Sequence, residues 1–463
     1  MNIRSEPLPD AELRGREMRL WVGNFPQRTS FVAVGGKNRL RRQAHLTTAG
    51  GAARALAVAC GLNLSGVASM AFGVDQIVSI VMLLSSAYLM RKYWRFVWSL
   101  PMTLVVATIV TYLMLGTLFY DFRLSIFEPE RFYQPYLCGV LIMAAVAGYT
   151  ASLADESSYR RWLVFVRNVF VLSSLSVWAS PLLYKYYVNL PDSAVEERMS
   201  GFFGNPNEAA MASLIAVTLL LVQPVRVFTI QVLLLCAGIG AIVLTFSKNG
   251  MSCLAVVLAL FAARQLKGYT LLVVPILATL GLLIIQDAQG FIGPIIENPV
   301  LELNQEQKNR LFAIGNILSG QINEQTTTQR SVLWHVVIAR AWDVFPLGSG
   351  IGSANNVIGG IIQKDQWLGV HNTFLMLWGE AGILPPLLLI SALVTLILRS
   401  IRRRLIVVQV GLFILVADMM SYHGALTLRY HNLLFGLLIG ATSLRVRRTR
   451  LERPEPSHSG FAR

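Results

Sequence analysis

The chain has 463 residues, of which 54% are hydrophobic and 14% charged, with a mean hydropathy of +0.55 and a formal net charge of +15. Soluble domains carry about 25% charged residues, so this chain has too few polar side chains to cover a globule of its size. These values exclude a soluble enzyme. The apolar residues fall into long runs between about residues 52 and 444, which predicts one membrane-embedded unit.

The two ends of the chain are polar and basic. Residues 1–51 are too long and too rich in Arg and Lys for a cleaved signal peptide, so we predict a cytoplasmic N-terminal tail there. Residues 52–444 are expected to form a polytopic membrane domain, and residues 445–463 a basic cytoplasmic C-terminal tail. All four cysteines lie inside apolar runs, so neither a disulfide framework nor a zinc site is expected.

The apolar runs predict an all-α membrane protein with about twelve transmembrane helices. Each run approaches the length of roughly 20 residues that a spanning helix needs. The runs cover approximately 52–73, 74–90, 98–119, 136–153, 162–182, 207–222, 227–246, 249–263, 268–286, 371–398, 405–421 and 427–444.

The basic residues give an independent prediction of orientation. If the N-terminus is cytoplasmic and the chain crosses twelve times, most of the 40 basic residues fall in the inner segments, and every short inner loop is basic. This pattern is typical of cytoplasmic loops in membrane proteins. The positive charge is therefore assigned to membrane orientation, and a nucleic-acid partner is not expected.

One outer segment, residues 287–370, is a long periplasmic loop in this topology. Five apolar residues in its second half recur at helical spacing: Trp334, Val337, Ile338, Ala341 and Phe345. Two interpretations stay open. The helix lies along the outer membrane surface, or it packs over the helix bundle.

Eleven basic residues fall on the outer side in this topology and run against the orientation trend, and three of them are candidate anion ligands. Arg198 precedes a turn-rich entry to a helix, where Pro206 marks the helix start and Asn205 or Asn207 can cap it. This arrangement fits an anion site, or a capping turn beside a solvated arginine. Lys248 lies in a tight connection and either binds an anion or reaches lipid headgroups. Arg330 is one turn from Trp334 and either binds an anion or stacks on that ring.

His371 is placed by the sequence at the outer start of a membrane helix, after the glycine-rich residues 346–352. Glu380 follows nine residues later inside an apolar run, where acids are usually functional, although it can also cap the break before Pro385. A second outer cluster contains His423, Arg429 and His431. The glycine-rich stretch is not a P-loop, and hydrolase, zinc-protease and ATPase motifs are absent from the sequence.

Taken in order, these motifs resemble the O-antigen ligase and polysaccharide polymerase superfamily of bacterial membrane glycosyltransferases. The resemblance rests on the topology and on a series of fragments over about residues 198–400: Arg198 with residues 201–207, Arg330, Trp334, residues 346–350, His371, Asn372 and residues 380–382. It implies a GT-C-like fold in the bacterial inner membrane, with both termini cytoplasmic and the active site facing the periplasm.

The resemblance also implies an activity. Members move a glycan from undecaprenyl diphosphate to lipid A–core (ligases) or to another repeat unit (polymerases), with inversion and without a metal or other cofactor. It assigns Arg198 and Arg330 to the diphosphate and His371 to the acceptor. Lys248 replaces an arginine common in the family, which keeps the charge but loses the bidentate fork. Supporting roles are expected for Asn207, Glu380, His423 and Arg429, and other polysaccharide-assembly membrane proteins are expected partners.

The residue chemistry agrees with this activity. Fixed cations in a preorganised site stabilise the charge that builds on a leaving diphosphate, and a histidine is suited to accept the proton of the attacking hydroxyl. A polysaccharide or lipid-linked oligosaccharide transporter or flippase is the alternative, and it predicts ionisable residues near the membrane midplane. A membrane acyltransferase would need a buried histidine at mid-membrane, which is not found. The sequence does not separate ligase from polymerase, and it does not identify the sugar.

Overall fold

The computed structural model describes residues 36–121, 128–153, 155–189, 198–265, 293–294, 296–298, 303–318, 330–355, 357–358, 361–362, 370–422 and 424–444. The chain divides into two units, Met1–Thr48 and Ala49–Arg463. In the first unit the described residues are the start of a helix that runs from Gly36 to Gly61, so the end of the expected tail is helical. The features below belong to the second unit.

The described residues form helices almost throughout. The larger ones are α2 (Gly36–Gly61), α3 (Leu64–Phe72), α4 (Gln76–Val97), α5 (Leu100–Leu118), α6 (Glu130–Ser152), α7 (Glu156–Trp178), α10 (Pro206–Val222), α11 (Phe228–Leu244), α12 (Lys248–Gln265), α15 (Gln305–Leu318), α17 (Arg330–Asp343), α18 (Thr373–Ala381), α19 (Leu384–Arg403), α20 (Ile406–Ser421) and α21 (Arg429–Ser443). Short elements are α8 (Ser180–Leu183), η1 (Tyr184–Tyr186), η3 (Ser353–Asn355), η4 (Ala425–Thr427) and an antiparallel pair of two-residue strands, β1 (Val357–Ile358) and β2 (Ile361–Ile362). The all-α prediction is confirmed at this level.

Within the described residues, three helices are long and apolar enough to cross a membrane: α5, α6 and α19. Two bent pairs raise the number to five if each pair is one span: Thr48–Gly61 with Leu64–Phe72, bent by 57°, and Glu156–Trp178 with Ser180–Tyr186, bent by 71°. Several helices could therefore span a membrane, and the count of twelve stays a prediction. The expected span 268–286 lies outside the described residues.

The expectation of one continuous span over 371–398 is wrong. Gly382 adopts φ 82°, a left-handed conformation that favours glycine, and it separates the nine-residue α18 from α19. A similar break separates α2 from α3, where Asn63 has φ 49°. Proline in the first turn of α5, α10 and α19 fits the starts of these helices, because its missing N–H has no intrahelical partner there.

The helix bundle has two ends that differ in composition. Ser79 of α4 and Cys138 of α6 line one cavity near the starts of these two helices, whereas Gly148 near the end of α6 approaches Val97 at the end of α4. One end carries Arg91, Lys92, Arg95, Arg160, Arg161, Arg226, Arg402, Arg403 and Arg404 at helix ends and connections. We call this the basic end and the other the site end.

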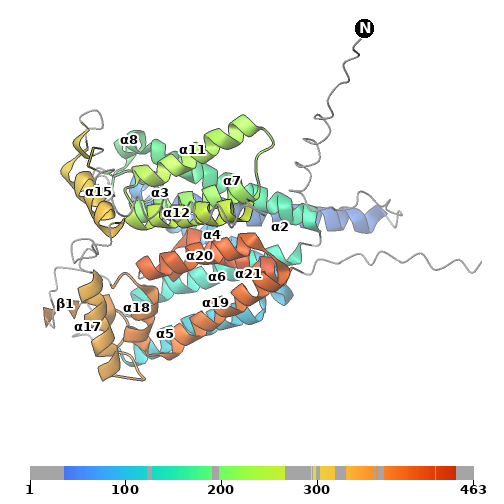
Figure 1. The fold of residues 1–463 in the computed structure, drawn as a ribbon. Coiled ribbons are helices and arrows are strands. Elements are labelled where there is room, and N and C mark those ends of the chain that lie inside the picture. The colour runs from blue at the N-terminus through green and yellow to red at the C-terminus, as the bar shows by residue number, and fades with distance from the viewer. Residues whose placement is uncertain are drawn as a thin grey trace, which may run out of the picture. The chain divides into compact units, whose positions relative to one another are not determined.

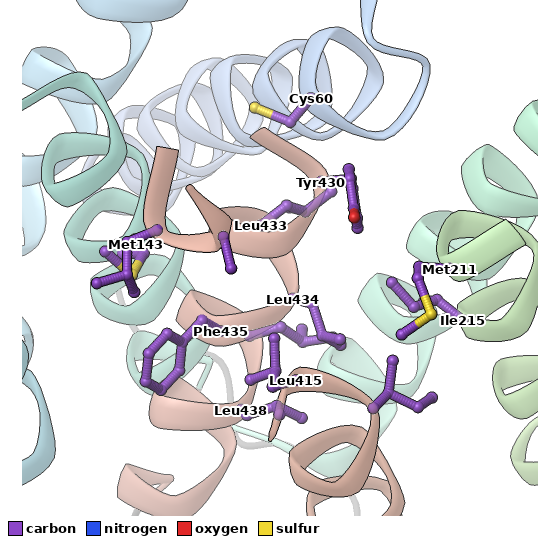
Figure 2. Packing of buried hydrophobic residues seen from close by; sticks show 14 of the residues in the cluster. Cys60, Met143, Met211, Ile215, Leu415, Tyr430, Leu433, Leu434, Phe435 and Leu438 are labelled. Atoms are coloured by element: carbon purple, nitrogen blue, oxygen red, sulfur yellow. The ribbon is translucent and has the colours of Figure 1, made fainter. Parts of the chain in front are cut away.

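The core is built around α21, which packs extensively against α6 and contacts α19 and α20 (Figure 1). Figure 2 shows its side chains Leu434 and Phe435 among residues from neighbouring helices, including Met143 of α6 and Met211 of α10. Gly436 allows this approach, because a Cβ there would lie 2.6 Å from the backbone oxygen of Met143. Large apolar side chains remain exposed on several helices, among them Phe72, Leu118 and Phe228, as a lipid-facing surface requires.

Helix α17, within the expected outer loop, packs on α18. Val337 and Ala341 are buried, and Val337 lies against Gly379. The indole nitrogen of Trp334 donates to the carbonyl of Val370 over 2.8 Å. This packing matches the second interpretation of the apolar face. Phe345 lies beyond the end of the helix and is 51% exposed, so its assignment to that face is wrong.

Candidate functional site

Arg198 is buried in the loop that enters α10, with 3% of its surface exposed. Its Nε donates to the carbonyl of Thr245 over 3.0 Å, which joins this loop to the connection between α11 and α12. The solvated-arginine interpretation is therefore wrong. The side chain is a fixed cation whose position is set by the fold.

Two tyrosines hold the same loop from the other side. The hydroxyl of Tyr184 donates to the Arg198 carbonyl over 2.9 Å, and the hydroxyl of Tyr187 donates to the Gly201 carbonyl over 3.1 Å. Burial raises the pKa of Tyr187 to about 12, so its hydroxyl keeps its proton at neutral pH. Gly201 has φ 59° and packs so closely on Ser176 that a side chain would not fit.

The start of α10 is capped by Asn205, whose side-chain oxygen accepts from the backbone N–H of Asn207 over 2.8 Å. Of the two candidate caps, the structure selects Asn205. Asn207 lies in the first turn and is half-buried.

Lys248 is the first residue of α12, and Arg198 contacts Thr245 three residues earlier. The two predicted cations are therefore on segments that touch. The next residue, Asn249, donates from its amide to the hydroxyl of Ser421 over 2.7 Å. This bond places the start of α12 beside the end of α20.

His371 lies two residues before α18 and not in its first turn, because Asn372 is the N-cap and accepts from the N–H groups of Phe374 and Leu375. The histidine is half-exposed and has φ 46°, an uncommon conformation for a residue other than glycine. The hydroxyl of Thr373 donates to the Tyr422 carbonyl over 2.6 Å. The start of α18 is thereby fixed to the same end of α20 as Asn249.

The remaining candidates from the sequence are Arg330, His423 and Arg429. Arg330 is the first residue of α17, one turn before Trp334, whose bond to Val370 brings that helix next to His371. His423 lies outside the described residues. Arg429 begins α21, donates from Nη2 to the hydroxyl of Ser79 at 3.4 Å, and lines a cavity described below.

His371 precedes the start of α18 and Glu380 lies at its end, so the two residues are roughly 13 Å apart at 1.5 Å per residue. It is fully buried, accepts from the Tyr112 hydroxyl over 2.6 Å and accepts from the N–H of Ala354 over 3.3 Å. The glycine-rich residues pack here too, since the N–H of Gly350 donates to the Glu380 carbonyl. Glu380 therefore anchors the glycine-rich loop to α5 and to the end of α18.

A group of polar residues lies between these segments, and it joins His431 of the expected outer cluster to Tyr422, Glu208, Asp418 and Tyr430, which the sequence alone did not indicate. The Tyr422 hydroxyl donates to Glu208 Oε1 over 3.3 Å. Asp418 Oδ2 accepts from the Tyr430 hydroxyl over 2.9 Å and lies 3.1 Å from His431 Nδ1. Acids inside apolar runs were the available signal for Glu208 and Asp418, because such residues are rare in membrane helices.

The group opens onto a cavity of about 310 Å³ at the site end. Its wall includes residues from the α2–α3 break and from α4, α6, α10 and α21, among them Asn63, Asp75, Ser79, Gln134, Glu208 and Arg429. Asn63 also donates to the carbonyl of Phe202 over 3.2 Å, in the loop that carries Arg198.

Comparison of the chain with protein-family models, with curated proteins and with solved structures gives no match. The site combines the fixed cation Arg198, a half-exposed histidine and a polar cavity on connected segments, which together suit the binding of an anionic group next to a hydroxyl-bearing molecule.

Proposed function

We propose that the chain is an inverting membrane glycosyltransferase that moves a glycan from undecaprenyl diphosphate to an acceptor hydroxyl. In this proposal the acceptor is another repeat unit or lipid A–core, the site end faces the periplasm, and the chain resides in the bacterial inner membrane with twelve spans.

The convergence of distant segments at the site end supports this proposal most strongly. Hydrogen bonds of Arg198 to Thr245, Asn249 to Ser421 and Thr373 to Tyr422 tie together the loop before α10 and the starts of α12 and α18. These segments carry Arg198, Lys248 and His371, which the sequence pattern selected independently of one another. A site built from three segments indicates a shared function.

In the proposed reaction the acceptor oxygen attacks the anomeric carbon from the face opposite the diphosphate. A new C–O bond forms as the old one breaks, and the bonding electrons leave with the diphosphate oxygen. Arg198, Lys248 and Arg330 stabilise that negative charge, and His371 takes the proton of the acceptor hydroxyl. Undecaprenyl diphosphate and the extended glycan are the products.

The transporter alternative predicts ionisable residues near the middle of spanning helices. Glu208 is the third residue of α10, His431 is the third residue of α21, and Asp418 lies in the last turn of α20. These groups gather at helix ends on one side, which favours surface chemistry over passage through the bundle.

Reconstitution separates the two functions. Proteoliposomes that hold the purified chain and lipid-linked glycan should form a heavier covalent glycan and free undecaprenyl diphosphate, both measured by mass spectrometry. A transporter would move the donor between leaflets with no change in mass. Unchanged donor in the presence of acceptor would refute the transferase.

The orientation has its own test. A reporter fused after Asp121, at the end of α5, should report the periplasm, and one fused after Arg403, at the end of α19, should report the cytoplasm. A cytoplasmic signal at Asp121 would place the site on the wrong side for a periplasmic donor.

A further inference from the structure

The cavity at the site end has no role in the reaction as described above. Its volume of about 310 Å³ lies at the lower end of the range of roughly 300–1,000 Å³ typical of small-molecule sites. Apolar residues of α4 and α6, such as Met82, Leu83 and Ile142, form part of its lining. Polar residues of the same helices, of α10 and α21 and of the α2–α3 break form the rest.

The polar wall mixes donors and acceptors. Asp75 and Glu208 contribute carboxylates, Arg429 a guanidinium, and Asn63 and Gln134 amides. One wall hydroxyl, that of Ser86, is buried and has no hydrogen-bond partner among the described residues. A buried polar atom without a partner is costly unless a ligand or water satisfies it.

This composition distinguishes between classes of ligand. A diphosphate offers only acceptor oxygens and is poorly matched to the carboxyl oxygens of Asp75 and Glu208, and a metal cation would be repelled by Arg429. A sugar ring carries hydroxyls that both donate and accept, and its C–H faces pack on apolar side chains. A sugar therefore matches both the polar and the apolar residues of the cavity lining.

We infer that this cavity binds a sugar unit of the glycan, held by Asp75, Glu208 and Arg429 while Ser86 faces a ring hydroxyl. The inference rests on the proposed function and adds a specificity site, distinct from the cations that face the diphosphate. Tyr422 links the two parts, because its hydroxyl bonds Glu208 and its carbonyl accepts from Thr373, two residues from His371.

Cys138 provides a probe of occupancy that does not depend on transfer. It lines the cavity and is partly exposed, whereas Cys60 and Cys253 are buried. In a Cys236→Ser background, the rate at which N-ethylmaleimide labels Cys138 reports access to the cavity. Two probes are used. The glycan fraction is the water-soluble glycan released by acid from lipid-linked oligosaccharides of the native cells, and the polyprenyl fraction is undecaprenyl diphosphate prepared separately.

We expect the glycan fraction to slow labelling of Cys138 and the polyprenyl fraction to have no effect. Asp75→Asn or Glu208→Gln should weaken the protection roughly tenfold, because each replaces one carboxyl oxygen of the cavity wall by an amide donor. Glu156→Gln is the matched control, since Glu156 lies in the first turn of α7 at the basic end.

Two further measurements guard against misfolding. The labelling rate without probe should be the same in all variants if the cavity keeps its shape. Ser86→Ala removes only a hydroxyl without a hydrogen-bond partner among the described residues, so it should retain stability and still weaken protection.

The sugar assignment would be overturned if only the polyprenyl fraction protected Cys138, or if neither fraction did. It would also be overturned if the glycan fraction protected Cys138 equally well in the Glu208→Gln variant. Covalent transfer without protection would leave the transferase standing and remove this site. Protection without any transfer would leave a glycan-binding site and remove the transferase.

Discussion

Replacing Arg198 by alanine should impair both stability and catalysis, and the structure allows the two effects to be separated. The side chain is buried and donates to the Thr245 carbonyl over 3.0 Å. A hydrogen bond to a charged group is worth about 1.5–3 kcal/mol, so Arg198→Ala should lower the free energy of unfolding by a similar amount. Loss of a cation that stabilises the leaving diphosphate should cost a further factor of about 10²–10³ in rate.

Arg167 supplies a matched control. It is also buried, at 7% exposed, and its Nη1 also donates to a backbone carbonyl, that of Gln223. Asn205 is the N-cap of α10 and Gln223 is its C-cap, so the two residues are roughly 25 Å apart at 1.5 Å per residue. Arg167→Ala should therefore lose comparable stability and retain its rate per folded molecule.

The assay measures kcat/KM with lipid-linked donor in detergent micelles, normalised to folded protein, together with the thermal unfolding midpoint of each variant. If Arg198→Ala loses stability as Arg167→Ala does but keeps its normalised kcat/KM, Arg198 only holds the loop to Thr245. The assignment to the diphosphate would then be wrong.

Three further predictions concern single side chains. Asparagine tolerates the left-handed backbone at position 371, so His371→Asn tests the imidazole without straining the chain. This variant should transfer glycan about 10²–10⁴-fold more slowly and lose the acidic limb of the pH–rate profile. Near-normal transfer would exclude a general base at this position. Glu380→Ala should destabilise the protein because the buried Tyr112 hydroxyl loses its acceptor. A double-mutant cycle with Tyr112→Phe should show a coupling free energy of about 1–3 kcal/mol, and additive effects of the two substitutions would contradict the hydrogen bond. Hydrogen bonds from Ser157 and Ser158 hold the pKa of Asp155 below its usual value. The stabilisation by ionised Asp155 is therefore present above the usual pKa and is lost as pH falls through the lowered pKa. Asp155→Ala should lower the free energy of unfolding by about 1 kcal/mol at pH 7, and an equal loss at strongly acidic pH would rule out an ionised N-cap.

The sequence predicted the helical class and the composition of the two ends because both depend on local properties. Apolar runs of helical length indicate helices wherever they occur. Basic residues beside those runs mark one end, and the outlying cations Arg198, Lys248 and Arg429 stand out against that trend. Lys248 and Arg429 begin helices at the site end, and Arg198 lies eight residues before the start of α10.

Breaks inside an apolar run were harder to predict. Residues 371–398 have the hydropathy of one span, but Gly382 turns the chain between α18 and α19. The same turn lets the glycine-rich loop pack on the end of α18, since a Cβ at Gly382 would lie 2.3 Å from the Pro346 carbonyl oxygen. Hydropathy does not record that close approach.

Only the tertiary structure decided which polar residues meet. Glu380 and Tyr112 are 268 residues apart in sequence, and Tyr422 and Glu208 are 214 apart. The cavity likewise requires four helices and the α2–α3 break to pack together before Asp75, Glu208 and Arg429 share one wall. Such partnerships arise from long-range packing, and a local pattern carries no information on which distant group will satisfy a buried polar atom.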